Sequence, residues 1–260
     1  MRLNYQKYSE SGAPLLVLHG LFGSLGNWGW HSKELSQHHS VIGVDLRNHG
    51  NSPHDAELSY PAMASDVLQL IEDLGFASVA IIGHSMGGKV AMELALQHHR
   101  VVDRLIVVDI APVGYPEDTQ THQRAIAGMK ALNLVGLKTR DEAETFLADY
   151  IEEEATRKFI LTNLARDEGG GFRWRLNLEA IEENYGKLRM KPTGKTPYRK
   201  PTLFIKGALS SYISSEDEEE ILRLFPEAKL KTIMQAGHWL HVDKPKVFQK
   251  FALNFLADKE

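Results

Sequence analysis

A serine between closely spaced glycines is the first place in this sequence where side chains could do covalent chemistry. The pattern G-x-S-x-G spans residues 83–87, with Ser85 at its centre, and directly follows an apolar run over 79–82. A sharp turn from a strand into a helix projects a serine hydroxyl away from the sheet, and it needs small residues two positions before and after. The pattern therefore predicts that Ser85 is a nucleophile for acyl transfer.

A second glycine-rich turn could stabilise the negative charge that forms during acyl transfer. The motif His-Gly-Leu-Phe-Gly, residues 19–23, directly follows an apolar run over 14–18. Acyl transfer needs two backbone N–H groups aimed at the carbonyl oxygen as it becomes negative. We expect these to be the amides of Leu21 and of Met86, the residue after the serine. A tight turn without a catalytic role is the alternative interpretation of residues 19–23.

A histidine near the C-terminus is the candidate general base. His238 follows the predicted strand 229–233, so its imidazole is expected at the carboxyl end of the last strand. Histidine titrates near neutral pH and can take the proton of a serine hydroxyl. His241, three residues on, could form a metal pair with His238, but no carboxylate or third histidine has ligand spacing. We therefore expect no metal.

The residues leave more than one candidate for the acid that would orient this histidine. The loop after the apolar run 202–205 has no carboxylate before Glu216, and the run from Ser215 to Asp217 has the composition of a helix start. Asp109 is the other candidate, because it interrupts an apolar run over 105–110, where a buried carboxylate is costly unless it is paired. A structural role for Asp109, capping the loop that follows, also stays open.

The elements that carry these residues alternate between strands and helices. Apolar runs typical of buried strands cover 14–18, 41–44, 79–82 and 105–110, and helical patterns cover 60–74 and 87–97. This alternation predicts a parallel sheet with helices on both faces and ligands at the carboxyl ends of the strands. The alternation stops after residue 109 and resumes with strands at 202–205 and 229–233 and a helix at 245–256.

The interruption predicts an inserted helical cap. Residues 115–195 contain helical patterns at 123–134, 140–151 and 177–188 but no run that resembles a strand. We therefore expect residues 1–114 and 196–260 to form one α/β core, with residues 115–195 as its lid. Apolar cap residues could line an acyl pocket, although packing inside the cap is the commoner use of such side chains. The candidates are Phe159, Leu164, Phe172 and Trp174.

Composition excludes several other classes of protein. The 260 residues include no cysteine, so disulfides, thiolate zinc sites and a cysteine nucleophile are excluded. An apolar fraction of 43% with a net charge of −4 is typical of a globular protein without a basic surface for nucleic acid. The apolar run at 15–18 is too short for a signal peptide or a membrane span. We expect a cytoplasmic protein with neither a nucleic-acid nor a membrane partner.

Five motifs together resemble the α/β-hydrolase superfamily, and closely the bacterial YbfF-type esterases with their mitochondrial relatives: HGLFGS, DLRNHGNS, GHSMGGK, DIAPVGY and AGHWLHVDKP. The resemblance spans nearly the whole chain. It implies an α/β-hydrolase fold, with a mostly parallel eight-stranded sheet flanked by helices and an inserted helical cap. It also implies the roles of nucleophile for Ser85, base for His238, acid for Asp109 and oxyanion amides for Leu21 and Met86. Dehalogenases and epoxide hydrolases use an aspartate nucleophile, so Ser85 argues against both.

The expected function is that of a monomeric serine carboxylester hydrolase without a cofactor, acting through an acyl-enzyme on Ser85. Its expected substrates are small-molecule short acyl esters and, as a second class, acyl-CoA thioesters, both taken from the resemblance. The residues expected to bind substrate are Phe22, Phe172, Trp174, Tyr212 and Trp239. The alternatives are a carbon–carbon hydrolase or lyase on the same scaffold, and a ligand-binding receptor that keeps an unused triad.

Overall fold

A computed structural model describes residues 1–116 and 120–257 of the chain. Its centre is a sheet of seven strands in the order β1-β3-β2-β4-β5-β8-β9. The strands are β1 (Tyr5–Lys7), β2 (Ala13–Leu18), β3 (His39–Val44), β4 (Val79–His84), β5 (Val102–Val108), β8 (Thr202–Gly207) and β9 (Ala228–Ile233). Every neighbouring pair is parallel except β1 with β3. The predicted α/β-hydrolase fold is confirmed, with seven strands in the central sheet of the described residues where eight were expected.

The N-terminal segment accounts for the difference in strand number. The Asn4 carbonyl accepts a hydrogen bond from the Asp45 amide at 2.9 Å, and the Asn4 amide donates to Ser52 Oγ at 2.8 Å. The Met1 ammonium group contacts Asp66. Residues 1–4 therefore bond to a loop and a helix, and only β1 pairs with the sheet at this edge. All three residues of β1 are exposed, so this strand has no apolar run that the sequence could reveal.

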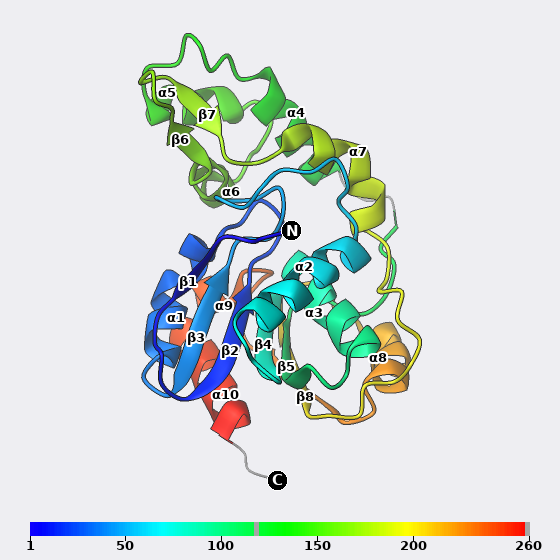
Figure 1. The fold of residues 1–260 in the computed structure, drawn as a ribbon. Coiled ribbons are helices and arrows are strands. Elements are labelled where there is room, and N and C mark those ends of the chain that lie inside the picture. Colours follow the sequence, from blue (N-terminus) through cyan, green and yellow to red (C-terminus); the bar gives the residue numbers. More distant parts are fainter. Residues whose placement is uncertain (117–119, 258–260) are drawn as a thin grey trace.

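Successive residues of the central strands fill two separate cores. In β2, Leu15 and Val17 belong to one apolar cluster, whereas Leu16 and Leu18 belong to the other. Helices α2 (Tyr60–Asp73), α3 (Met86–Gln97) and α8 (Glu218–Leu224) cover the face of Leu16, and α1 (Gly29–Leu35) and α10 (Pro245–Ala257) cover the opposite face (Figure 1). Burial on both faces explains why these strands are continuous apolar runs.

Local signals in the sequence set the ends of the helices. Helix α2 begins after Ser59, whose side chain accepts a hydrogen bond from the Ala62 amide, and it has a proline in its first turn. It ends before Gly75, which has a φ of 74° that favours glycine.

A short helix, α9 (Leu240–Asp243), precedes α10. None of the helices in the described residues has the length and apolar character needed to cross a membrane.

The chain leaves the sheet after β5 and returns to it at β8. Between them lie α4 (Gln120–Ala131), α5 (Arg140–Leu147), α6 (Glu154–Leu161), β6 (Leu164–Arg166), β7 (Phe172–Trp174) and α7 (Leu178–Leu188), gathered beyond one end of the sheet (Figure 1). The prediction of no strand in this region was wrong, because β6 and β7 form an antiparallel pair. Each has three residues, too few for a distinct apolar run. The predicted cap and core also include 117–119 and 258–260, which lie outside the described residues.

A buried lysine of α3 joins the two ends of this insertion to the core. Lys89 Nζ donates to the carbonyls of Val113, at 2.5 Å, and Met190, at 2.6 Å. Between the same two segments, the Tyr115 amide donates to the Arg189 carbonyl at 2.8 Å. Burial lowers the pKa of Lys89 to about 7. Because a neutral amine still has two N–H groups, both hydrogen bonds can persist after deprotonation.

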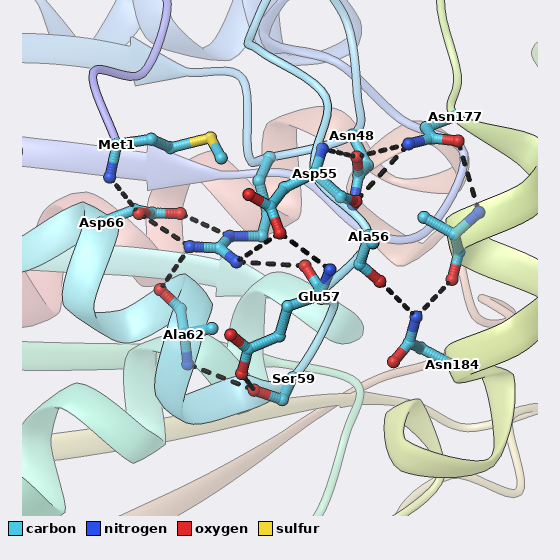
Figure 2. A network of polar contacts seen from close by, with 12 residues as sticks. Met1, Asn48, Asp55, Ala56, Glu57, Ser59, Ala62, Asp66, Asn177 and Asn184 are labelled. Carbon is cyan, nitrogen blue, oxygen red and sulfur yellow. Dashed lines mark hydrogen bonds and ion pairs between the residues drawn. The ribbon is translucent and has the colours of Figure 1, made fainter.

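Side-chain amides also join the cap to the loop after β3 (Figure 2). The main-chain N–H of Asn177 donates to the main-chain carbonyl of Asn48 at 3.0 Å, and the side-chain Nδ2 of Asn177 donates to Asn48 Oδ1 at 3.1 Å. Asn184 Nδ2 donates to the Ala56 carbonyl at 2.8 Å. Close by, Arg47 forms a buried ion pair with a carboxylate of α2. The cap is thus docked through hydrogen bonds to a loop whose own position is fixed by the core.

Candidate active site

The predicted nucleophile lies at a strained turn between β4 and α3. Ser85 has φ 52° and ψ −117°, a backbone conformation that residues with a Cβ rarely adopt. Close packing explains the flanking glycines: a Cβ at Gly83 would lie 2.3 Å from the Gly87 carbonyl oxygen, and one at Gly87 would lie 2.5 Å from the His19 carbonyl oxygen. Only glycine fits at either position, so the strand and the helix can approach closely enough to form the turn.

The acid candidate Asp109 and the base candidate His238 are joined directly. His238 Nδ1 lies 2.8 Å from Asp109 Oδ2, although 129 residues separate them in the chain. Asp109 is fully buried, and its other oxygen, Oδ1, accepts a hydrogen bond from the Gly207 amide at 2.9 Å. The Ser210 hydroxyl donates to Oδ2 as well. A buried carboxylate with three partners satisfies the requirement that such a group be paired.

The competing acids lie elsewhere and have a different role. Asp217 Oδ2 accepts hydrogen bonds from the amide of Ser214 at 2.7 Å and from its hydroxyl at 2.9 Å. Ser214 Oγ in turn accepts from the Glu216 amide at 3.2 Å. The run of acids therefore begins a helical segment, with Ser214 as the cap where the sequence suggested Ser215.

Aromatic rings hold the imidazole of His238 on two sides. Tyr212 stacks on it, with ring centroids 4.1 Å apart and an interplanar angle of 29°. The His84 ring lies 4.7 Å away, and His84 Nε2 is 3.0 Å from the His238 carbonyl oxygen. Burial holds the pKa of His84 well below its usual value, so this ring is neutral at pH 7. With Nδ1 bonded to the buried carboxylate, His238 has Nε2 left for proton transfer.

His241, the possible metal partner of His238, is occupied in another way. Its ring stacks on Trp28 with centroids 4.3 Å apart and an interplanar angle of 6°. Within residues 1–116 and 120–257, no group of three or more histidine or acidic side chains could hold a metal ion. His241 is therefore a packing residue under the site.

The two residues predicted to supply the oxyanion amides belong to segments that meet near the serine. Met86 is the first residue of α3, where a backbone N–H has no partner within the helix. Leu21 lies in the turn after β2, and this turn passes close to the nucleophile, since a Cβ at Gly20 would lie 3.3 Å from Ser85 Cβ. The amides of the two loops can therefore face one substrate oxygen.

A cavity of about 1210 Å³ separates the sheet from the cap and contains the reacting groups. Ser85 and His238 line it together with three of the residues predicted to bind substrate: Phe22, Tyr212 and Trp239. The cap contributes Phe159, whose ring centroid lies 5.2 Å from that of Trp239. Apolar rings from both parts of the chain thus lie within reach of the nucleophile.

The other predicted cap residues lie away from this cavity. Phe172 is buried in the apolar cluster that the cap shares with the Leu16 face of the sheet, and the guanidinium carbon of Arg166 lies 3.9 Å from its ring centroid. Trp174 Nε1 donates to the Met129 carbonyl at 2.9 Å. Leu164 is fully buried. None of the three lines the cavity, so they pack within the cap, the commoner use of such residues.

Several residues of the site carry no signal in the sequence. Tyr150, Ile151 and Ile160 of the cap line the cavity, although nothing in their spacing separates them from interior residues of the cap. Ser210, a partner of Asp109, lies in the same carboxylate-free loop that made this acid hard to identify. These contacts depend on how distant segments meet.

The chain belongs to the α/β hydrolase fold family, because a model of that family matches residues 13–245. The mouse protein named sn-1-specific diacylglycerol lipase ABHD11 is 43% identical over 95% of this chain and 82% of its own length. Esterase YbfF of Escherichia coli strain K12 is 34% identical over 99% of this chain and 100% of its own length. This confirms the resemblance to YbfF-type esterases.

A solved structure supports the same relationship. The protein described as a marine microorganism esterase superposes with a TM-score of 0.96 at 44% sequence identity, covering 98% of this chain and 99% of its own. This chain is therefore a hydrolase-family protein whose relatives are named esterases and lipases.

Proposed function

We propose that this protein is a serine carboxylester hydrolase that acts through an acyl-enzyme on Ser85. The main support is the 2.8 Å contact between His238 Nδ1 and the buried Asp109 carboxylate. This contact leaves the imidazole Nε2 for proton transfer, and His238 lines the same cavity as the strained Ser85.

Acylation begins when Ser85 Oγ attacks the ester carbonyl carbon and its proton passes to His238 Nε2. The carbonyl oxygen becomes an anion, which the backbone N–H groups of Leu21 and Met86 stabilise. The Asp109 carboxylate holds the imidazole in the required tautomer and stabilises the imidazolium. The tetrahedral intermediate then collapses, the bond to the leaving oxygen breaks, and His238 gives that oxygen its proton. The alcohol departs and the acyl group remains on Ser85.

Deacylation repeats these steps with water as the nucleophile. His238 takes a proton from the water as its oxygen attacks the acyl carbon, and the same two amides stabilise the second oxyanion. Collapse breaks the bond to Ser85 Oγ, which recovers its proton from the imidazolium. The products are a carboxylic acid and the free enzyme, so no cofactor is consumed.

The cavity supports a small-molecule acyl ester as substrate. Its volume of about 1210 Å³ is somewhat above the roughly 300 to 1,000 Å³ of typical small-molecule sites, so a small ester has room in it. Phe22, Phe159 and Trp239 offer an apolar surface for an acyl chain. Charged residues that include Arg124 and Glu153 line another part, suited to a polar leaving group. We propose short acyl esters first and acyl-CoA thioesters second, because a thioester carbonyl reacts by the same steps.

The test is to look for the acyl-enzyme and for repeated turnover in one experiment. Purified protein is mixed rapidly with p-nitrophenyl esters of graded chain length, quenched in acid and analysed by peptide mass spectrometry. We expect an acyl adduct on the peptide that contains Ser85, followed by many equivalents of p-nitrophenol. An adduct without further turnover would favour a receptor, and turnover that the Ser85→Ala protein retains would contradict the mechanism. The same analysis with acyl-CoA substrates tests the thioester proposal.

A further inference from the structure

The turn that carries Leu21 is held by hydrogen bonds on each of its peptide units. The Gly20 carbonyl accepts from the Gly23 amide at 2.9 Å and lies 2.8 Å from His19 Nδ1. This carbonyl and the Leu21 N–H belong to one planar trans peptide, so they point in opposite directions. Fixing the carbonyl against the core therefore directs the Leu21 N–H away from these partners.

A second buried histidine holds the next peptide. The Phe22 amide donates to His49 Nε2 at 3.3 Å, and His49 Nδ1 lies 2.9 Å from the Arg47 carbonyl oxygen. Nε2 can accept only in the neutral ring with its hydrogen on Nδ1. Burial lowers the pKa of His49 to about 3, so the neutral ring is the form present at pH 7.

The third peptide of the turn is held from the cap. The Phe22 carbonyl accepts a hydrogen bond from Asn163 Nδ2 at 2.7 Å across 141 residues of sequence. Phe22 has a φ of 60°, a conformation that a phenylalanine adopts only where its surroundings impose it. Asn163 is thus a hydrogen-bond donor from the cap that holds the carbonyl of this strained residue in place.

Asn163 is itself fixed at the end of α6. It is 1% exposed, its Nδ2 also donates to the Ile160 carbonyl at 3.1 Å, and its own carbonyl accepts from the Arg175 amide at 2.9 Å. The same helix contributes Phe159 and Ile160 to the cavity. The roof of the pocket and the support of the oxyanion turn are therefore one rigid unit of the cap.

We propose that Asn163 is a positioning residue that holds the oxyanion turn from the cap, so that this one contact of the cap sets the catalytic rate, whereas the other docking contacts do not. This inference rests on the proposed ester hydrolysis. It assigns to the cap a part in stabilising the transition state that is separate from contact with the acyl chain.

The experiment compares two variants of Asn163 with a matched asparagine of the cap. Asn163→Ser keeps a hydroxyl that can bond to the Ile160 carbonyl but is too short to reach the Phe22 carbonyl. Asn163→Asp replaces the donor with a carboxylate oxygen, which cannot donate to the Phe22 carbonyl. Asn184→Ser is the control, because Asn184 also donates from the cap to a core carbonyl, that of Ala56, but at the loop after β3 (Figure 2). Thermal unfolding of each protein reports its stability.

We expect Asn163→Ser to lower kcat by about 10- to 100-fold, less than the loss of a whole oxyanion donor, with KM within about threefold. The loss should be the same for short and long acyl chains. The affinity for a boronic acid, which forms a tetrahedral adduct on Ser85, should fall by a similar factor. Asn163→Asp should lose at least as much, and Asn184→Ser should keep kcat within about threefold.

Two results would overturn the proposal. One is a kcat for both Asn163 variants within about threefold of wild type, and the other is an equal loss in Asn184→Ser, which would indicate general loosening of the cap. Failure of the proposed function is recognised separately, because the wild-type protein itself would then hydrolyse no ester. If Asn163→Asp does not fold, the comparison of the two serine variants decides.

Discussion

The sheet edge and the cap hold their functional residues in different ways. At the carboxyl ends of the strands, main-chain geometry fixes the reacting groups: Ser85 and Asp109 both have a φ of 52°, and a Cβ at Gly207 would lie 2.3 Å from the carbonyl oxygen of Gly237. The cap is attached to the core largely through side chains, as at Asn163 and Lys89. Core variants should therefore change the rate with every substrate, whereas most cap variants should change which substrates react fastest.

Removal of the nucleophile should have the largest effect. Ser85→Ala should lower kcat by about 10⁶-fold for esters of every chain length, which is the size of the loss when a serine protease is deprived of its nucleophile. Alanine keeps the Cβ, so the strained turn and the thermal unfolding temperature should change little. Steady-state kinetics on the folded variant measure the loss. Wild-type activity in that protein would end the serine mechanism.

The acid should come next. Asp109→Asn should lower kcat by about 10³ to 10⁴-fold with little change in KM, because the amide favours the wrong imidazole tautomer. Glu216→Gln is the matched control and should stay within about threefold, since an acid at the start of a helix contributes only about 0.3 to 1 kcal/mol to stability. A near-normal Asp109→Asn enzyme beside an inactive Glu216→Gln enzyme would move the acid to the loop after β8.

Acid should destabilise the core, because burial lowers the pKa of its five buried histidines: His19, His31, His49, His84 and His241. In the unfolded chain these rings take up protons near pH 6.5, and in the folded chain only at lower pH. The free energy of unfolding should therefore fall as pH drops below about 6.5, by up to about 1.4 kcal/mol per pH unit for each histidine. Urea unfolding followed by circular dichroism at pH 7.5 and 5.5 measures this. Equal values at the two pH values would contradict it.

Cap residues should give the smallest and most selective effects. Phe159→Ala should change the ratio of kcat/KM for short and long acyl esters by about tenfold, because this ring lines the cavity. Trp174→Ala is the control, since Trp174 packs within the cap and should lower the rates with all chain lengths in proportion. A panel of p-nitrophenyl esters measures both ratios. An unchanged ratio in Phe159→Ala would remove this ring from the acyl pocket.

The sequence predicted the parts of the fold that local patterns specify. Strands buried on both faces are continuous apolar runs, so five parallel strands of the core could be located from such runs between residues 14 and 205. Strand β9 was predicted over 229–233 and ends, as predicted, at Ile233. The position of Ser85 followed from glycines that have no room for a Cβ. Strand β1 could not be found in this way, because Tyr5–Lys7 pairs at an exposed edge.

Contacts between distant segments set the limit of what the sequence could predict. The residues alone left the acid open between Asp109 and the run at 215–217, and only the meeting of β5, β8 and β9 brings Asp109 to His238. Periodicity also does not tell which face of the cap turns toward the core, so Phe172 was expected to bind substrate, whereas the cavity is lined by Phe159. Asn163 had no signal, because a single asparagine carries no pattern.

The attachment of the insertion by Lys89 bears on how this family can diversify. One side-chain nitrogen reaches the carbonyls of Val113 and Met190, so the chain leaves and re-enters the core at nearly the same point. An inserted segment whose ends lie together can gain, lose or exchange residues without separating the paired strands β5 and β8 that flank it. Evolution can therefore replace the whole roof of the pocket while the sheet beneath keeps its chemistry, and the same junction is a natural site for grafting a cap from a relative.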